Sequence, residues 1–392
     1  MNMRRVLFVD DDAETREMYK QLETYWGIAQ EVHTASSGKE ALELMVRNKF
    51  DVVVADLVMS DMAGLDFLSE VVKSHPEAAR IVITGSADHL KAAEALNVAH
   101  RYFSKPFDLM LLGTLLERLC AYHHLLRNER IRRMIFQTGA LPVLPATWMK
   151  LSDAVNSPYT GIPDIAAIIE QDPGLASRLL HTVNSAHFGI ARKVVSCSEA
   201  IQILGLEVVR GVMMGIQIFD FYHKSQFVRS TFGKIWAHSL RTAMGARKIS
   251  ELEKQSNDLC NVAFISGLLH DVGKLVLAAN AEREYSLALE LCEKTDVPLE
   301  QAELGSFGAS HAQIGAYLFA LWGFPDNVVQ AVENHHKLAE ITAFTPALAI
   351  HAAQCLDPSS TKENQLNTAL LSNLGLDSRI EVWRSALADQ PT

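Results

Sequence analysis

The chain has 392 residues, a length that predicts two or three domains rather than one small module. Apolar residues make up 48% of the sequence and charged residues 21%, which excludes a disordered or fibrous chain. A net charge of −10 disfavours a general nucleic-acid or anionic-membrane binder, because such partners require a basic surface. The apolar runs are too short for a membrane span, and the five cysteines are scattered without a C-x-x-C pair. We therefore expect a cytoplasmic protein with reduced thiols and no membrane association.

The first part of the chain, up to about residue 108, alternates short β-rich runs with stretches of helical periodicity. We expect strands over 5–9, 31–35, 52–55, 80–84 and 102–103, separated by helices over 12–26, 38–48, 66–74 and 89–96. This alternation predicts a doubly wound α/β domain built on a five-stranded parallel sheet. In such a fold the functional groups collect at the carboxyl ends of the strands.

Beyond residue 108 the strand signal disappears and apolar residues recur at helical spacing. They predict one long helix that leaves the first domain, with an apolar stripe formed by Leu109, Leu112, Leu116, Leu119, Tyr122, Leu126 and Ile131. The stripe could pair with a second copy of the chain and so give a homodimer. Alternatively, this stretch is the last helix of the first domain, followed by a solvated linker.

The rest of the chain reads as helical. Residues 139–356 contain no alternation long enough for a sheet, and two short helices are expected within 367–387. The chain is thus predicted to be multidomain, with a first domain at 1–122, a linker helix at 123–137, an all-α domain at 138–356 and a C-terminal helical tail at 357–392.

Polar side chains stand where the predicted strands end: Asp10, Asp11, Asp56, Thr84 and Lys105. Because the carboxyl ends of parallel strands share one edge of the sheet, we expect these side chains to converge on one pocket. Neighbouring carboxylates repel one another and need a cation, and oxygen ligands of this kind suit Mg²⁺. A carboxylate beside Mg²⁺ and a lysine is suited to attack phosphorus and form an aspartyl phosphate. The lysine and threonine side chains would then hold the phosphoryl oxygens.

Residues 4–122 resemble a response-regulator receiver domain. The resemblance rests on residues 9–11, on Asp56 within 54–59, on 61–64, on Thr84-Gly85 and on 102–107. It implies that Asp56 is the phosphoacceptor, assisted by Thr84 and Lys105, and that Thr84 and Tyr102 form the pair that reports phosphorylation. It also implies the following Mg²⁺ ligands: Asp10, Asp11, Asp56 and the Val58 carbonyl. Ser60 replaces the proline usual in the family, which should alter only the stiffness of the loop.

The helical half contains a series of histidines with one adjacent acid: His238, His270, Asp271, His311, His335 and His336. Imidazole and carboxylate ligands together suit borderline transition metals such as Fe, Mn, Zn or Ni. Lys274 follows His270 by one helical turn, which would place its ammonium on the same face, beside a metal-bound phosphate. Metal-activated hydroxide attacking a phosphate ester is the reaction that such a site would support. For a lone histidine such as His238 or His311, a packed core residue is the competing interpretation.

Residues 138–356 resemble the HDOD domain, a branch of the HD superfamily of metal-dependent phosphohydrolases found mostly in bacterial signalling proteins. The motifs that carry the resemblance lie at 141–145, 172–175, 183–186, 200–205, 236–239, 267–274, 311, 322–325 and 335–336. Two features depart from the catalytic HD pattern. No glycine-tyrosine-proline signature follows His336, and Gln354 stands near the place of the last metal-binding aspartate. A neutral amide is a poorer metal ligand than a carboxylate, which weakens the case for a dinuclear hydrolytic site.

Together the two halves favour a bacterial two-component response regulator. A histidine kinase or phosphotransfer protein would phosphorylate Asp56 and so control an HDOD domain that acts as an interaction module for a downstream signalling protein. The alternative is a phosphorylation-controlled, metal-dependent phosphohydrolase acting on a nucleotide or cyclic dinucleotide. Direct DNA binding is not expected, because no helix-turn-helix with a basic recognition helix is evident and the net charge is adverse.

Overall fold

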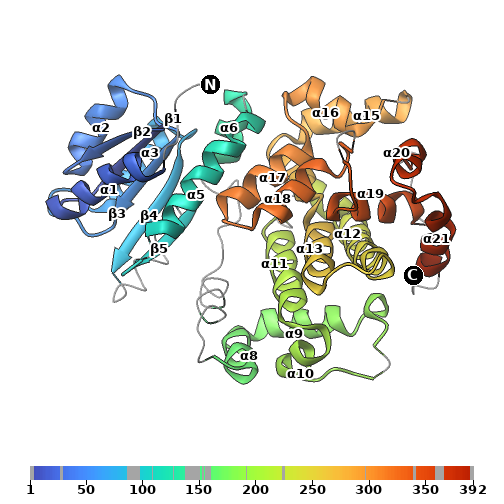
Figure 1. Ribbon diagram of the computed structural model, residues 1–392. Coiled ribbons are helices and arrows are strands. Elements are labelled where there is room, and N and C mark those ends of the chain that lie inside the picture. Colours follow the sequence, from blue (N-terminus) through green and yellow to red (C-terminus); the bar gives the residue numbers. More distant parts are fainter. Residues whose placement is uncertain are drawn as a thin grey trace. The chain divides into compact units, whose positions relative to one another are not determined.

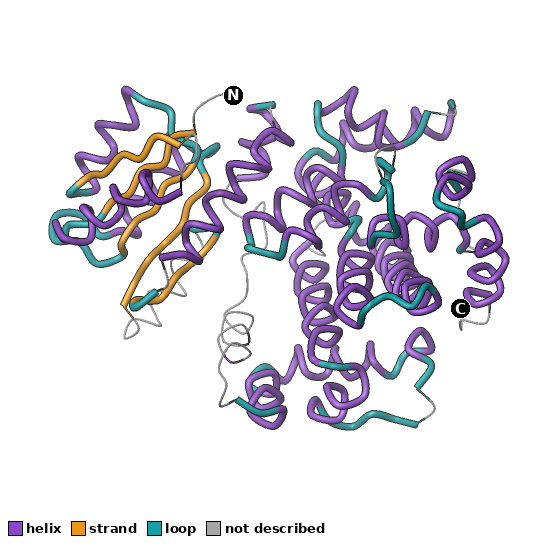
Figure 2. The backbone as a smooth tube through the Cα atoms, viewed as in Figure 1, coloured by secondary structure: helices purple, strands orange, loops and turns teal. Residues whose placement is uncertain are grey.

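The computed structural model describes residues 4–26, 30–85, 98–107, 109–126, 128–136, 151, 154, 160–190, 192–222, 226–295, 297–338, 341–357 and 366–388. These residues form two compact units. The first comprises the described residues up to 136 together with 317–324, and the second comprises the other described residues from 151 onward. Among the described residues, strands occur in the first unit alone, and the second is built from helices (Figure 2).

The first unit contains a parallel sheet with strand order β2-β1-β3-β4-β5 (Figure 1). Its strands are β1 (Arg4–Val9), β2 (Gln30–Ala35), β3 (Val52–Asp56), β4 (Ala79–Gly85) and β5 (Arg101–Lys105). Helices α1 (Ala13–Trp26), α2 (Gly38–Arg47), α3 (Gly64–Ser74) and α5 (Leu109–Tyr122) accompany them. Strand β3 is buried along its whole length, as a central parallel strand must be when helices cover both faces. The predicted doubly wound sheet is confirmed, whereas the helix expected over 89–96 lies outside the described residues.

The single long helix predicted over 109–131 is wrong. Helix α5 ends at Tyr122, a short 3-10 turn η1 (His123–Leu126) follows, and α6 begins at Glu129 and ends at Phe136. All the residues of the predicted apolar stripe except Leu109 are buried in the structure. The stripe residues other than Leu109 are therefore packed inside the chain rather than presented as an open helix face.

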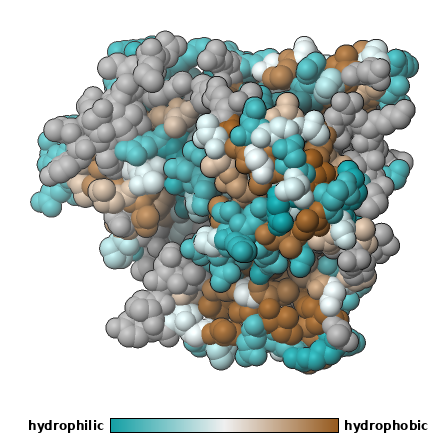
Figure 3. Space-filling view, turned by 45° about the vertical axis from the view of Figure 1, so that its right-hand side comes forward, coloured by the Kyte–Doolittle hydropathy of each residue, from teal (hydrophilic) through white to brown (hydrophobic). Residues whose placement is uncertain are grey.

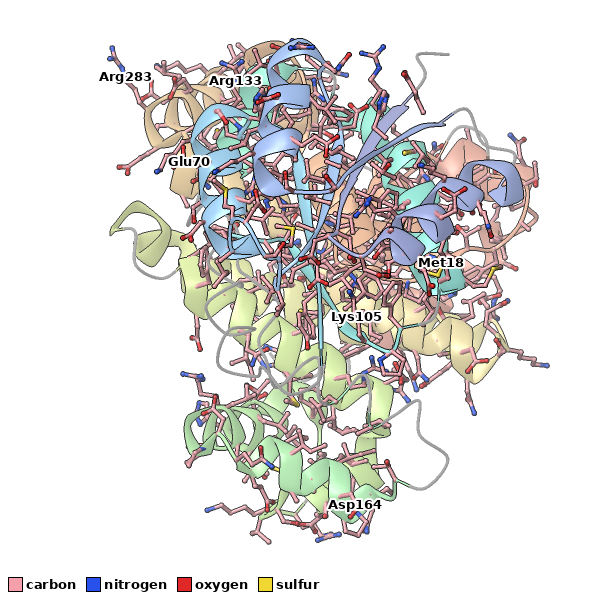
Figure 4. The ribbon with its side chains drawn as sticks, turned by 90° about the vertical axis from the view of Figure 1, so that its left-hand side faces the viewer. Met18, Glu70, Lys105, Arg133, Asp164 and Arg283 are labelled. Carbon is pink, nitrogen blue, oxygen red and sulfur yellow. The ribbon has the colours of Figure 1, made fainter. Side chains whose placement is uncertain are left out.

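Helix α6 packs on the first unit at the end of the sheet where β3 and β4 begin. Glu129 pairs with Lys49 at 2.8 Å, and a buried guanidinium, that of Arg80 at the start of β4, donates to the Phe136 carbonyl at 2.8 Å. The same guanidinium donates to the carbonyls of Val98 and Ala78 at 2.6 and 3.0 Å. Figure 4 labels Lys105 and Arg133, which lie toward opposite ends of this unit. The segment predicted as a linker helix at 123–137 thus belongs structurally to the first unit up to residue 136.

The second unit is helical, as expected. Its helices are α8 (Ile162–Glu170), α9 (Pro173–Val183), α10 (Cys197–Leu204), α11 (Leu206–Tyr222), α12 (Gln226–Leu252), α13 (Asn257–Leu269), α14 (Val272–Asn280), α15 (Glu282–Lys294), α16 (Leu299–Phe307), α17 (His311–Leu321), α18 (Asp326–Asn334) and α19 (Pro346–Leu356). The stretch Asn257–Asn280 is apolar and long enough to cross a membrane, but 83% of its most apolar window is buried inside the structure. It is the central part of a helical core rather than evidence for a membrane span.

The predicted pair of short helices at the end of the chain is present as α20 (Thr368–Asn373) and α21 (Ile380–Ala388), with a 3-10 turn between them. Both pack into one hydrophobic core with α12 and α19. Trp383 is fully buried there, and its indole N–H donates to Glu253 at 2.8 Å. Apolar residues also reach the surface of this unit: Figure 3 shows them gathered toward its lower end, where α8 to α10 lie in Figure 1.

Candidate phosphoacceptor pocket and histidine cluster

The polar residues predicted at the strand ends meet in one pocket. Val9 pairs with Ala55 across β1 and β3, so Asp10 and Asp56 leave the sheet side by side. Lys105, at the end of β5, places its Nζ atom 3.1 Å from Asp10 Oδ2 and 2.5 Å from Asp56 Oδ2. Asp10 is 1% exposed and Asp56 8%. Parallel topology and matched strand ends therefore bring two buried carboxylates onto one ammonium.

The loop after β3 is held tightly against the sheet. A Cβ atom on Gly64 would lie 2.1 Å from the Asp56 carbonyl oxygen, a distance that only glycine avoids. The Val58 amide donates to Asp56 Oδ1 at 3.0 Å, which orients the carboxylate from the other side. Asp56 is therefore fixed both through its backbone and through its side chain.

The electrostatics of the pocket favour a bound cation. Burial raises the pKa of Asp10, and this outweighs the hydrogen bond from the Asp12 amide and the charge of Lys105. Burial lowers the pKa of Lys105, but its hydrogen bond to Asp56 and the charges of Asp56 and Asp10 outweigh burial and raise that pKa. One ammonium thus faces two carboxylates, and the resulting excess of negative oxygen ligands is what Mg²⁺ binds.

The other predicted receiver residues surround this pocket. Asp11 is exposed, and its Oδ2 accepts a hydrogen bond from the Ser60 amide at 2.8 Å. Val58 is 54% exposed. Tyr102 lies on β5, partly buried against the core of the unit. Thr84 pairs with Ser104 through the backbone of β4, and its side chain lies outside what the structure describes.

The predicted histidines of the second unit also come together, from separate helices. His238 lies on α12, His270 ends α13, and Asp271 directly precedes α14. His311 begins α17, and His335 and His336 follow α18. Two groups have ligand atoms within 4.8 Å of one another: His238 with His270 and Asp271, and His311 with His335 and His336. Asp271 joins the groups, because its Oδ1 lies 3.3 Å from His270 Nε2 and 3.5 Å from His311 Nε2.

Hydrogen bonds fix the tautomers of the buried rings. The Nδ1 atoms of His270 and His335 lie 2.7 and 2.6 Å from the carbonyl oxygens of Gly267 and Val332. A carbonyl only accepts, so each Nδ1 carries the proton and each Nε2 presents a lone pair. His311 Nδ1 donates in the same way to Glu303 Oε2 at 2.6 Å. These rings therefore turn their Nε2 lone pairs toward the centre of the cluster.

Some of these inward-facing atoms have no hydrogen-bond partner among the described residues. They include Asp271 Oδ1 and His335 Nε2, both in fully or nearly fully buried side chains. Buried acceptors without a donor are costly, and a cation would stabilise them. Imidazole nitrogens with one carboxylate oxygen are a donor set that fits a transition-metal ion.

Three rings of this cluster favour the neutral imidazole form. Burial lowers the pKa of His238 to about 4 and holds the pKa values of His335 and His336 well below the usual range. Burial raises the pKa of Asp271, but interactions with its neighbours, the Lys274 ammonium among them, outweigh burial and hold that pKa well below its ordinary value. Neutral rings beside an ionised carboxylate are the protonation states that metal ligation requires.

Lys274 places its ammonium at the cluster, although α13 and α14 are not one continuous helix. The chain breaks between α13 and α14 at His270 and Asp271, so Lys274 does not follow His270 along one helix. Its Nζ atom donates to Asp271 Oδ2 at 2.9 Å. Gln354, from α19, does reach the cluster as its position near the expected aspartate implied: its Nε2 lies 2.7 Å from His270 Nε2 and 3.5 Å from His238 Nε2.

Two supporting residues were missed by sequence reasoning. Glu303 on α16 is fully buried and accepts from both the backbone amide and the Nδ1 of His311, at 2.8 and 2.6 Å. A carboxylate behind a ligating histidine fixes its ring and raises its basicity. A Cβ atom on Gly273 would lie 2.0 Å from the His311 carbonyl oxygen, so glycine allows α14 and α17 to approach. The glycine at the end of the His-Asp-Val-Gly stretch was the available signal, whereas no motif marks Glu303.

Family comparisons cover both units. The HDOD domain family matches residues 141–338, and the response regulator receiver domain family matches residues 6–117. The chemotaxis protein CheY of Thermotoga maritima is 35% identical over 106 residues, which are 27% of this chain and 88% of that protein. The transcriptional regulatory protein ZraR of Escherichia coli K12 is 30% identical over 177 residues, 45% of this chain and 39% of that protein.

An HDOD domain protein of unknown function from Geobacter sulfurreducens, known from a crystal structure, is 24% identical with a TM-score of 0.49. The match covers 71% of this chain and 99% of that one. The chain spans about two fifths of the length of the first curated relatives that it matches, including a Treponema pallidum protein of which it covers 38%. The family matches span both units in order, and the chain therefore belongs to the HDOD family as a response regulator whose receiver domain precedes an HDOD output domain.

Proposed function

We propose that phosphorylation of Asp56 controls the HDOD domain, which acts on a downstream signalling protein by binding it. The phosphoryl group would come from a histidine kinase or a phosphotransfer protein. The observation that carries this proposal is the convergence of Asp10, Asp56 and Lys105, with Lys105 Nζ 2.5 Å from the Asp56 carboxylate. Transfer needs a nucleophilic carboxylate beside positive charge, and this pocket supplies both.

In this proposal Asp10, Asp11 and Asp56 hold Mg²⁺ together with the Val58 carbonyl. Bound Mg²⁺ supplies charge stabilisation for the phosphoryl oxygens. An Asp56 oxygen attacks phosphorus as the phosphorus–nitrogen bond of the donor phosphohistidine breaks. Lys105 then moves its hydrogen bond from the Asp56 carboxylate to a phosphoryl oxygen. Thr84 and Tyr102, on neighbouring strands, are the residues through which the change would spread.

Phosphorylation is tested with a small phosphodonor and Mg²⁺, followed by intact-mass measurement. We expect one phosphoryl group per chain in the natural sequence and none in Asp56→Asn. Asp66→Asn is the matched control, because Asp66 is an exposed carboxylate on the adjacent helix α3. Unchanged modification of Asp56→Asn would show that the acceptor lies elsewhere.

We further propose that the histidine cluster binds a divalent transition-metal ion such as Fe, Mn, Zn or Ni. The support is chemical: His270 Nε2 and His311 Nε2 lie 3.3 and 3.5 Å from Asp271 Oδ1, and neither this oxygen nor His335 Nε2 has a hydrogen donor among the described residues. Metal analysis of protein purified without chelators tests this. A histidine cluster that takes up no transition metal would refute it.

Hydrolysis of a nucleotide or cyclic dinucleotide at this cluster is the second candidate function. Its support is the same ligand set, with Lys274 close enough to the cluster to contact a phosphate. Against it stands the Gln354 amide, which faces His270 where the hydrolytic pattern has a carboxylate. Turnover on a nucleotide panel that disappears in His270→Ala would favour the enzyme over the binding module.

The proposed setting is the cytoplasm, with a histidine kinase or phosphotransfer protein as input partner and no contact with DNA. Pairing of two chains through the α5–α6 stripe is not part of this proposal, because that stripe is buried. We place the end of the receiver domain after α6, at Phe136, since Arg80 and Lys49 hold this helix to the sheet.

A further inference from the structure

The histidine cluster has two halves that differ in how their ligand atoms are occupied. We call one the amide half: His238 Nε2, His270 Nε2 and Asp271 Oδ2. We call the other the histidine half: His311 Nε2, His335 Nε2, His336 Nε2 and Asp271 Oδ1. Each half contains one of the two groups of close ligand atoms. The halves share Asp271: its Oδ2 lies 3.9 Å from His238 Nε2, and its Oδ1 lies between His270 Nε2 at 3.3 Å and His311 Nε2 at 3.5 Å.

The His270 and Asp271 ligand atoms of the amide half already have hydrogen donors. The Gln354 side-chain amide donates to His270 Nε2 at 2.7 Å and lies 3.5 Å from His238 Nε2. The Lys274 ammonium donates to Asp271 Oδ2 at 2.9 Å. An ammonium and an amide N–H thus take the place that a cation would occupy, and their positive ends point at the lone pairs. A metal could enter this half only by displacing both.

The ligand atoms of the histidine half are open by comparison. His335 Nε2 and Asp271 Oδ1 are buried and have no donor among the described residues. His311 Nε2 holds a lone pair, because Glu303 takes the proton on its Nδ1. His336 Nε2 lies 3.1 Å from that lone pair and so donates to it. His336 is only partly buried, and among the described residues its contact with His311 is the hydrogen bond that a cation in this half would replace.

We propose that this HDOD domain holds a single transition-metal cation, in the histidine half, and that Gln354 and Lys274 keep the amide half closed. This inference rests on the metal binding proposed above and adds its stoichiometry and its place. The closed half is the one that contains the His270-Asp271 pair next to Gln354. Gln354, which stands where a carboxylate was expected, therefore acts as a hydrogen-bond donor that keeps a metal out of this half, and not as a weaker metal ligand.

The test is titration of the full-length protein with Co²⁺ in the presence of excess Mg²⁺, which occupies the oxygen ligands of the receiver pocket. Visible absorption of bound Co²⁺ gives the equivalence point, and equilibrium dialysis gives the number of ions retained. We expect one Co²⁺ per chain in the natural sequence and in His238→Ala, and none in His335→Ala. Gln354→Asp should bind two. His181→Ala, which removes an exposed histidine on α9 of the same unit, should still bind one.

The outcomes distinguish metal binding by the cluster from the number and place of the bound ions. No Co²⁺ in the natural sequence would overturn the proposed metal site itself. Two Co²⁺ in the natural sequence, or loss of the single ion in His238→Ala, would leave metal binding intact but overturn the inference. A well-folded Gln354→Asp that still binds one ion would overturn the role of Gln354. If Gln354→Asp does not fold, as judged by circular dichroism, the contrast between His238→Ala and His335→Ala decides.

Discussion

Replacing Gly273 with alanine should damage the second unit by direct overlap. The added Cβ atom would lie 2.0 Å from the His311 carbonyl oxygen and 2.7 Å from the His311 Cα, whereas ordinary contacts begin at 3.4 Å. Relief requires the start of α14 and the start of α17 to separate by more than 1 Å at the oxygen. Both partners are backbone, so no side chain can rotate away. Forced overlap in a packed core costs about 1–3 kcal/mol and occasionally more, and we expect about 3 kcal/mol here.

The expected loss of stability can be measured as a fall in the melting temperature, Tm. For a domain of roughly 200 residues, 1 kcal/mol shifts Tm by about 2–4 °C, so Gly273→Ala should lower the Tm of the helical unit by about 6–12 °C. The same shift moves His311 away from Asp271 and should weaken Co²⁺ binding at least tenfold. Differential scanning calorimetry of the full chain, with and without Co²⁺, measures both.

A matched glycine on the neighbouring helix provides the control. Nothing lies within 4 Å of a Cβ atom on Gly305 of α16. Gly305→Ala should therefore leave Tm unchanged or raise it, because alanine is favoured over glycine in a helix by up to about 1 kcal/mol. A Gly273→Ala protein that melts with the natural one, or with Gly305→Ala, would refute the claim that this close approach positions the cluster.

Three further outcomes are expected. Glu303→Gln keeps the size of the side chain but removes the charge that accepts the His311 Nδ1 hydrogen bond, so Co²⁺ affinity should fall about 10–100-fold. Glu300→Gln, on the same helix, should leave Co²⁺ affinity unchanged. Equal affinities of the two variants would contradict the role of Glu303 in orienting His311. The pKa values of His335 and His336 are lower in the folded than in the unfolded chain, so protonation at low pH favours the unfolded state. The free energy of unfolding should be constant above about pH 6.5 and should fall below it by about 1.4 kcal/mol per pH unit for each histidine. Urea midpoints that do not change between pH 7 and 5 would contradict this. Arg80→Leu leaves buried acceptors, including the Phe136 carbonyl oxygen, without their donor, but it also removes a charge whose burial is costly. The net effect should be to destabilise the first unit by about 2–4 kcal/mol. Faster proteolysis near α6 would report this loss, and Arg133→Ala, which changes an exposed arginine, is the control.

The receiver pocket was predictable because its geometry follows from topology alone. In a parallel sheet, residues that end successive strands share one edge, so Asp10, Asp56 and Lys105 had to meet. The break between α5 and α6 was not predictable in the same way. Leu119, Leu126 and Ile131 keep an apolar spacing through a 3-10 turn, and all three are buried although they do not lie on one helix. Periodicity reports burial, and here burial continues where the helix does not.

The histidine cluster was predicted in its members and only partly in its geometry. The candidate ligands could be predicted from their residue types, histidine and aspartate. Gln354 lies beside His270, near where an aspartate was expected. The spacing from His270 to Lys274 is that of one helical turn, and Lys274 does reach the cluster, through the Asp271 carboxylate, although a turn at His270 and Asp271 separates α13 from α14. Glu303 precedes His311 across the turn between α16 and α17, and such a contact depends on how two helices meet rather than on any periodic pattern.

Strand β4 has a consequence for how a signal can leave the receiver. Arg80, near its start, donates to the Phe136 carbonyl at the end of α6, and Thr84, near its end, pairs through the backbone with Ser104 of β5. The four residue steps between them span about 13 Å at roughly 3.3 Å per residue. A strand buried in a close-packed sheet shifts as a nearly incompressible rod. We therefore expect a displacement of β4 at its carboxyl end to reach the start of the strand, where Arg80 binds the end of α6.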